Sequence, residues 1–211
     1  MKKVLLIGDS IRLGYDKYVK LALKEKAEVI YPAENCRSSA YVLRSMFFWN
    51  EWLKLDEDID VIHWNAGLWD CLRLLDGKHL IPLDQYKENI ERICFHFKKW
   101  FPKAKIIFAT STPVQEELFG ECKRLNKDIE MYNDVACKIV KGQGGYIDDL
   151  YTVMNNYPIS YHSDGTHYYT KEGTEVITNA VLESICEQLN TAVPKLDFDK
   201  CYNPVDGFLG L

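Results

Sequence analysis

The sequence lacks the features that would place it among membrane proteins or nucleic-acid-binding proteins. No stretch approaches the roughly 20 consecutive apolar residues that a membrane-spanning helix requires. Lysine and arginine number 26 against 31 aspartates and glutamates, so there is no basic surplus of the kind that binds nucleic acid. Internal repeats and low-complexity segments are absent as well. We therefore expect neither a nucleic-acid partner nor a membrane partner.

Paired cysteines and cofactor motifs are also missing. The seven cysteines contain no Cys-x-x-Cys motif and no paired spacing, which is typical of reduced thiols. His, Cys and carboxylate residues do not cluster at ligand spacings, and the nucleotide signatures Gly-x-x-x-x-Gly-Lys and Gly-x-Gly-x-x-Gly are absent, so we expect no metal and no other cofactor. The Met-Lys-Lys start has the charge of a signal peptide, but its apolar run ends at Ile7 and is too short for one. Together these features predict a cytoplasmic protein.

What is present suits one globular domain, since 211 residues with 47% apolar composition can bury a sizeable core. Short apolar stretches that resemble strands alternate with segments of helical periodicity. The expected strands are 4–7, 29–31, 58–64, 105–110 and 146–147. Such alternation predicts an α/β fold, a five-stranded parallel sheet with helices on both faces. We place the domain at 1–190 and a C-terminal tail at 191–211, where helical periodicity stops.

The first motif that could take part in a reaction is Gly8-Asp9-Ser10, directly after the apolar run Val4–Ile7. Gly8 permits a sharp turn, and a helical pattern begins after Ser10. Ser10 is thus predicted at the carboxyl end of a strand and the amino end of a helix, where free N–H groups can bind an oxyanion. Taken alone, the tripeptide is equally typical of an ordinary turn.

The second motif, Ser163-Asp164-Gly165-Thr166-His167-Tyr168, lies near the other end of the chain. A carboxylate and an imidazole three residues apart can make contact, so that the acid orients the ring. Asp149, in the pair Asp148-Asp149 after the fifth strand, is a rival carboxylate that spacing alone does not exclude.

Together the two motifs closely resemble the GDSL or SGNH hydrolase family, and the resemblance runs from residue 4 to about residue 190. It implies a serine esterase with a three-layer α/β/α flavodoxin-like fold and no metal. Carried over to this sequence, it implies Ser10 as nucleophile, His167 as general base and Asp164 as the group that orients His167.

The sequence departs from the family pattern at the groups that would bind the oxyanion. The loop 33–40 has no glycine to offer a backbone N–H, so Ser39 or Ala40 would have to supply it, and we select Ala40. Aligned on Gly67 and Asp70, the family's Gly-x-Asn-Asp pattern has Trp69 in place of the asparagine. We expect the Asn65 side chain to replace it, together with the Ser10 N–H. The alternative for Asn65 is a cap of the turn, which would leave one donor missing.

Residues around these motifs indicate what kind of ester would bind. Asp9, Arg37 and Trp69 are candidate substrate contacts. Four further aromatic residues could stack on sugar rings, as could Trp69. They are Trp64, Tyr15, Tyr168 and Tyr169. We therefore expect a small-molecule ester substrate, most simply an acetyl group on a carbohydrate. Two alternatives stay open: a lipid or thioester hydrolase of the same family, and a non-catalytic flavodoxin-like binding scaffold.

Overall fold

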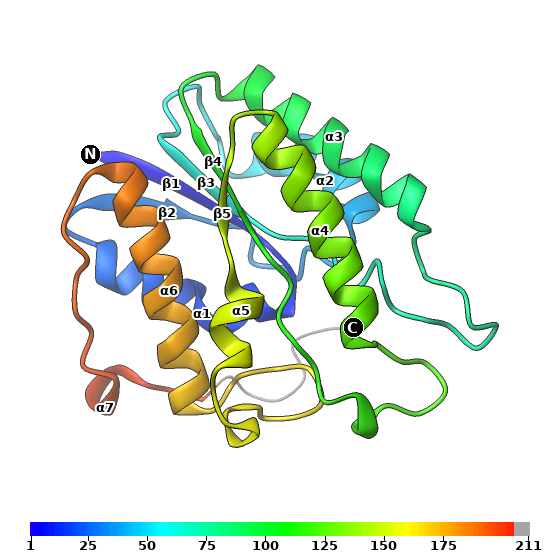
Figure 1. Cartoon of the computed structure of the whole chain (residues 1–211). Coiled ribbons are helices and arrows are strands. Elements are labelled where there is room, and N and C mark those ends of the chain that lie inside the picture. Colours follow the sequence, from blue (N-terminus) through cyan, green and yellow to red (C-terminus); the bar gives the residue numbers. More distant parts are fainter. Residues whose placement is uncertain (205–211) are drawn as a thin grey trace.

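The core of the molecule is a five-stranded sheet, seen in a computed structural model that describes residues 1–204 (Figure 1). The strands are β1 (Lys2–Ile7), β2 (Ala27–Ile30), β3 (Val61–Trp64), β4 (Lys105–Ala109) and β5 (Tyr146–Asp148). Every pair of neighbours is parallel, in the order β2-β1-β3-β4-β5. The predicted parallel α/β sheet is therefore confirmed. Because the strands are parallel, all five carboxyl ends meet at one edge of the sheet.

The central strands form because their residues are apolar without alternation, as a sheet covered on both faces requires. Val4–Ile7 of β1 and all four residues of β3 are buried. His63 is the polar exception in β3. Its Nε2 lies 2.8 Å from Asp148 Oδ2 and its Nδ1 lies 3.5 Å from the Tyr15 hydroxyl, so the buried imidazole is paired on both sides.

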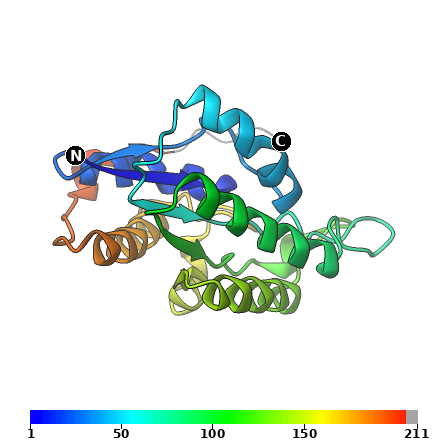
Figure 2. The same cartoon turned by 90° about the horizontal axis from the view of Figure 1, so that it is seen from above.

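Helices cover both faces of the sheet. They are α1 (Ser10–Leu23), α2 (Ser39–Trp52), α3 (Leu83–Trp100), α4 (Asn126–Gly142), α5 (Leu150–Asn155), α6 (Lys171–Leu189) and α7 (Phe198–Cys201), with short 3-10 helices η1 (Glu116–Leu118) and η2 (Ile159–Tyr161). Figure 1 shows α1 and α6 on one side of the sheet and α2, α3 and α4 on the other. Seen from above, α3 and α4 run side by side (Figure 2).

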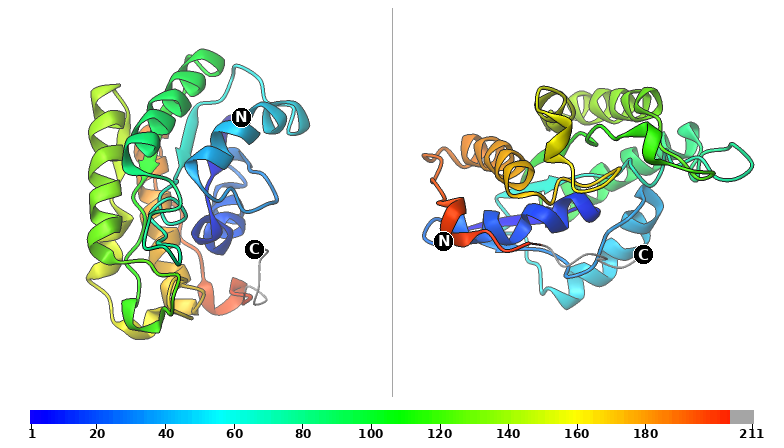
Figure 3. Two further views of the ribbon diagram at one scale, coloured as in Figure 1. Left: turned by 90° about the vertical axis from the view of Figure 1, so that its right-hand side faces the viewer. Right: turned by 90° about the horizontal axis from the view of Figure 1, so that it is seen from below.

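Two helices were not expected from the sequence. The six-residue α5 and the four-residue α7 are too short to display a helical period. In α7 the buried Phe198 packs on Tyr18 of α1, with ring centroids 5.2 Å apart, so this part of the expected tail lies beside α1 (Figure 3). The rest of the tail, 205–211, lies outside the described residues.

Within the described residues 1–204, we find no helix both long and apolar enough to cross a membrane. All seven cysteines are free thiols, and Cys36, Cys71, Cys94 and Cys186 are buried.

Replacing Leu6, which is 0% exposed at the centre of the sheet, with alanine should lower the free energy of unfolding by about 2–5 kcal/mol. The cause is lost apolar burial together with the cavity left behind. Chemical denaturation measures the change. The matched control is Leu75→Ala, because Leu75 is 73% exposed and should contribute less than about 0.5 kcal/mol. Equal losses in the two variants would contradict the assigned core.

Candidate active site

Ser10 lies where β1 ends and α1 begins, at the carboxyl edge of the sheet. Asp9 caps the helix, since its Oδ1 accepts a hydrogen bond from the Ile11 N–H at 2.9 Å. Gly8 is required for space: a β-carbon there would lie 2.2 Å from Asn65 Oδ1 and 2.7 Å from Arg12 Cβ. The turn therefore brings the loop after β3 directly against the residues that precede Ser10.

The loop before α6 brings His167 to Ser10. His167 Nε2 lies 2.7 Å from Ser10 Oγ, and Nδ1 lies 2.8 Å from Asp164 Oδ2. Because an ionised carboxylate can only accept, the ring proton is assigned to Nδ1, which leaves Nε2 free to accept from the Ser10 hydroxyl. The three residues that the two motifs supplied thus form a continuous hydrogen-bonded chain.

Asp164 is held in its ionised form. Burial by itself would raise the pKa of this carboxyl, but hydrogen bonds from the His167 amide, the His167 ring and the Thr166 amide outweigh it and hold the pKa below its usual range. The rival carboxylate Asp149 instead accepts from the Thr110 hydroxyl and from Thr152 at the start of α5. Asp164 is therefore the acid that contacts His167.

Tyr169 is a residue of this site that sequence reasoning placed only among the aromatics. Its hydroxyl donates to the Ser10 carbonyl at 2.5 Å, and its ring stacks on the His167 ring with centroids 4.7 Å apart. Gly14 of α1 makes room, because a β-carbon there would lie 2.8 Å from the Tyr169 ring. Tyr169 therefore fixes the histidine loop to the helix that carries Ser10.

Asn65 follows β3, and hydrogen bonds hold both its backbone and its side chain. Its N–H donates to the Ile7 carbonyl at 3.0 Å, and its Oδ1 accepts from the Asp9 N–H at 3.3 Å. This bond fixes the orientation of the amide, since the side-chain oxygen must face Asp9. The side-chain nitrogen, Nδ2, donates to no group within residues 1–204, so it remains a free donor near Ser10.

The loop between β2 and α2 differs in detail from the sequence expectation. The Ser39 N–H is not free, because it donates to the Asp70 carboxylate at 3.0 Å. The Ala40 N–H lies in the first turn of α2 and, among the described residues, donates to nothing. A backbone conformation that favours glycine occurs at neither Ser39 nor Ala40. It occurs at Arg37, whose φ is 50°, a left-handed value. A sequence pattern does not reveal this, because arginine gives no signal for positive φ.

Asp70 joins this loop to the loop after β3. It is 0% exposed and accepts from both the N–H and the hydroxyl of Ser39, whose oxygen in turn accepts from the Asn89 amide at 2.9 Å. Burial raises the pKa of Asp70 from 3.8 to about 6, against the opposing effect of the Ser39 hydrogen bonds. The carboxyl is therefore a structural clamp between two edge loops.

Several proposed substrate contacts do not agree with the structure. Asp9 is wholly buried, so its side chain caps α1 and does not reach a bound molecule. Trp64, Tyr15 and Tyr168 are likewise in the core, at 3% exposure or less, and cannot stack on a sugar ring. Trp69 is half-buried and stays a candidate.

Arg37 is half-buried too, with its guanidinium over the Tyr41 ring at 5.1 Å. It also stays a candidate for contact with substrate.

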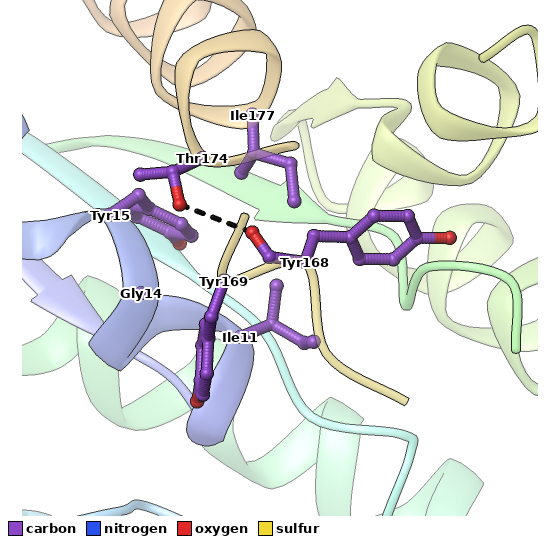
Figure 4. A pocket seen from close by; sticks show the side chains of 7 residues that line it. All are labelled: Ile11, Gly14, Tyr15, Tyr168, Tyr169, Thr174 and Ile177. Atoms are coloured by element: carbon purple, nitrogen blue, oxygen red, sulfur yellow. Dashed lines mark hydrogen bonds between the residues drawn. The ribbon is translucent and has the colours of Figure 1, made fainter. Parts of the chain in front are cut away.

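The cavity drawn in Figure 4 is too small for a substrate. Its volume is about 10 Å³, room for a single water molecule. Ile11 and Tyr15 of α1 face Ile177 of α6 across it, and the Thr174 hydroxyl donates to the Tyr168 carbonyl at 3.1 Å. This cavity is a packing gap between α1, the histidine loop and α6.

Comparison with known proteins shows what the chain is similar to. No family model matches the chain. A GDSL esterase/lipase of Arabidopsis thaliana is 25% identical over 207 residues, covering 85% of this chain and 83% of that protein. The rice (Oryza sativa subsp. japonica) GDSL esterase/lipase WDL1 is 25% identical over 122 residues, 53% of this chain. The chain is therefore similar to GDSL esterase/lipases, in one case along most of its length. It spans about half of the rice relative, 46% of its length.

Solved structures share the fold of this chain. A lipase/acylhydrolase from Enterococcus faecalis superposes with a TM-score of 0.72 at 21% identity, over 93% of this chain and all of that one. The acetylxylan esterase Axe2 from Geobacillus stearothermophilus, as a catalytic mutant, gives a TM-score of 0.70 at 16% identity, over 93% of this chain and 97% of that one. These likenesses establish the three-layer α/β/α architecture.

The structure also bears on metal binding by this chain. Among residues 1–204 no group of three or more His, Cys, Asp or Glu side chains is arranged to hold a metal ion.

The raised pKa of Asp70 predicts a specific dependence of stability on pH. Between 3.8 and about 6 the unfolded chain has lost the Asp70 proton while the folded protein retains it. Stability should therefore fall as pH rises through this window, by no more than about 3 kcal/mol. Asp70→Asn removes this titration, so the stability of the wild type relative to this variant should fall over the same window, measured by urea unfolding at graded pH.

The matched control for Asp70 is Asp58→Asn. Asp58 is exposed, and its carboxylate contacts only Lys103 among the described side chains, so its replacement should leave the wild-type pH profile in place. A pH profile of Asp70→Asn parallel to that of the wild type would refute the shifted pKa.

Proposed function

We propose that the protein hydrolyses carboxylic esters through an acyl-enzyme formed on Ser10, with the chemistry carried by residues 1–190. The observation that carries this proposal is the 2.7 Å contact between His167 Nε2 and Ser10 Oγ. A serine hydroxyl is a poor nucleophile unless a base adjoins it, and here an imidazole oriented by a carboxylate does so. Two chain segments 157 residues apart meet to make this contact.

In the first half of the reaction, Ser10 Oγ attacks the carbonyl carbon while its proton moves to His167 Nε2. The Asp164 carboxylate accepts from Nδ1–H throughout and stabilises the imidazolium. The tetrahedral intermediate then breaks its bond to the alcohol oxygen, which takes the proton from Nε2. In the second half, water replaces the alcohol, gives its proton to Nε2 and displaces Ser10 Oγ, which takes that proton back as the acid leaves.

Three donors are proposed to bind the oxyanion of the tetrahedral intermediate: the N–H of Ser10, the N–H of Ala40 and the side-chain amide of Asn65. Each belongs to a segment at the carboxyl edge, and the Ser10 and Ala40 N–H groups lie in first helical turns, where N–H groups lack intrahelical partners. The bond from the Asp9 N–H to Asn65 Oδ1 supports the role of Asn65, because it directs the amide nitrogen away from the turn. Donors fixed in this way need no rearrangement as charge develops.

For the substrate, we propose a small acyl group, most simply acetyl, on a carbohydrate. Two observations support this choice: the half-buried Trp69 in the loop that begins with Asn65, and the shared fold with acetylxylan esterases. The competing lipid or thioester hydrolase is supported by the likeness to a lipase/acylhydrolase. Acetylated sugars compared with acyl thioesters of graded length would separate the two.

Ser10→Ala should reduce the hydrolysis of p-nitrophenyl acetate by at least about 10³-fold, because it removes the attacking oxygen. The wild type should also be labelled by a fluorophosphonate, and the variant should not. Turnover is followed by p-nitrophenolate absorbance and labelling by mass spectrometry.

The matched control is Ser184→Ala, which removes a hydroxyl from α6 outside the proposed site and should leave both readouts unchanged. Undiminished turnover in Ser10→Ala would exclude Ser10 as nucleophile. A wild type that neither turns over esters nor takes the label would favour the non-catalytic scaffold.

Asn65→Asp tests the oxyanion donor while retaining an oxygen that can accept from the Asp9 N–H. We expect kcat to fall by at least about 10²-fold, since the loss of one such donor costs about 10²–10³ in rate, and the melting temperature to fall because the new carboxylate is buried beside Asp9. Steady-state kinetics and calorimetry give the two readouts. A kcat within tenfold of the wild type would assign Asn65 to capping the turn alone.

A further inference from the structure

Arg124 is a cation at the carboxyl edge with no anionic partner in the described part of the chain. Its Nε donates to the Leu68 carbonyl at 2.5 Å, and its guanidinium carbon lies 5.9 Å from the Trp69 ring centroid and 6.0 Å from that of Phe119. Within residues 1–204 no carboxylate lies within ion-pair distance of it, and its two terminal nitrogens donate no hydrogen bond. The forked end of the guanidinium is thus available to a ligand.

The contacts of Arg124 place it between the two loops that build the site. Leu68 and Trp69 belong to the loop that begins with Asn65. On the other side, Phe119 lies against the histidine loop, since a β-carbon at Gly165 would be 3.6 Å from the Phe119 ring.

Further bonds hold the segment around Arg124 in position. The Gln115 N–H donates to the Gly165 carbonyl at 2.9 Å, and the N–H and carbonyl of Lys123 pair with the backbone of Arg73 at 3.0 and 2.8 Å. The segment that carries Arg124 is therefore fixed to the histidine loop at one end and to the loop after β3 at the other.

An unpaired cation in a half-buried position is costly, because burial removes water that no other group replaces. Burial lowers the pKa of Arg124, and the nearby acidic groups Cys71, Asp9 and Asp164 act in the opposite direction. Asp9 precedes Ser10 and Asp164 contacts His167, and Arg124 forms an ion pair with neither aspartate. A bound anion would relieve this cost.

We propose that Arg124 binds a carboxylate carried by the ester substrate, so that the enzyme prefers anionic esters to neutral ones; this rests on the function proposed above. The planar fork of the guanidinium matches the two oxygens of a carboxylate. A monoanion fits better than a dianionic phosphate, because a single unpaired guanidinium stands beside two aspartates. A purely structural arginine would need only the Nε bond to Leu68.

The test uses matched pairs of esters that differ by one carboxylate. 4-Acetoxybenzoate against its methyl ester places the charge in the alcohol half, and monophenyl succinate against its methyl ester places it in the acyl half. The wild type should favour the charged member of one pair at least about tenfold in kcat/KM, mainly through a lower KM. Arg124→Met should abolish this preference and leave the neutral esters within about twofold.

Two further variants and added salt serve as controls for this test. Arg124→Lys retains the charge without the fork and should show an intermediate preference, and added salt should weaken the wild-type preference. Arg92→Met removes an exposed arginine of α3, paired only with Glu88 within the described residues, and should behave as wild type. An equal charged-to-neutral ratio in the wild type and Arg124→Met would overturn the proposal, as would a wild type without preference.

Binding without turnover separates this proposal from the hydrolase mechanism. In Ser10→Ala protein, calorimetry should show tighter binding of the charged ester than of its methyl ester, and the added Arg124→Met change should remove the difference. Carboxylate binding without hydrolysis by the wild type would refute the proposed mechanism alone. Hydrolysis through Ser10 with equal binding of charged and neutral esters would refute the role of Arg124 alone.

Discussion

The structure depends on one contact, the hydrogen bond between His167 Nε2 and Ser10 Oγ, which joins the two ends of the domain. Each partner is held by its own element, since Ser10 begins α1 and His167 precedes α6. These two helices pack together on one face of the sheet, and the bond from the Tyr169 hydroxyl to the Ser10 carbonyl ties the histidine loop to α1 directly. The geometry of the site is therefore a consequence of helix packing and the hydrogen bonds that fasten it.

The carboxylates at the carboxyl edge differ in pKa because their surroundings differ. Asp164 accepts from two backbone N–H groups and an imidazole, and these donors keep its pKa low despite partial burial. Asp70 and Asp9 are wholly buried, and burial raises the pKa of each despite their hydrogen bonds. The carboxyl next to the imidazole is thus the one whose pKa is lowered, while Asp70 and Asp9 organise the loops.

Hydrogen bonds between the loops at this edge give it rigidity. The Cys36 N–H donates to the Gly8 carbonyl at 3.1 Å, and the Asn65 N–H donates to the Ile7 carbonyl at 3.0 Å. Asp70 adds the clamp on Ser39. The turn before Ser10 is therefore fastened to both neighbouring loops, and oxyanion donors in these loops would be oriented before a substrate arrives.

The sequence predicted the sheet, the main helices and the three residues of the hydrogen-bonded chain, because apolar periodicity and short motifs are local. Gly8-Asp9-Ser10 and Asp164 to His167 each encode their own turn, and the family resemblance supplied their pairing. Three features depend on contacts between segments far apart in the chain. The capture of the Ser39 amide by Asp70, the burial of Trp64 and the place of Arg124 follow from packing. No local pattern specifies which distant group a side chain meets, so folding alone determines them.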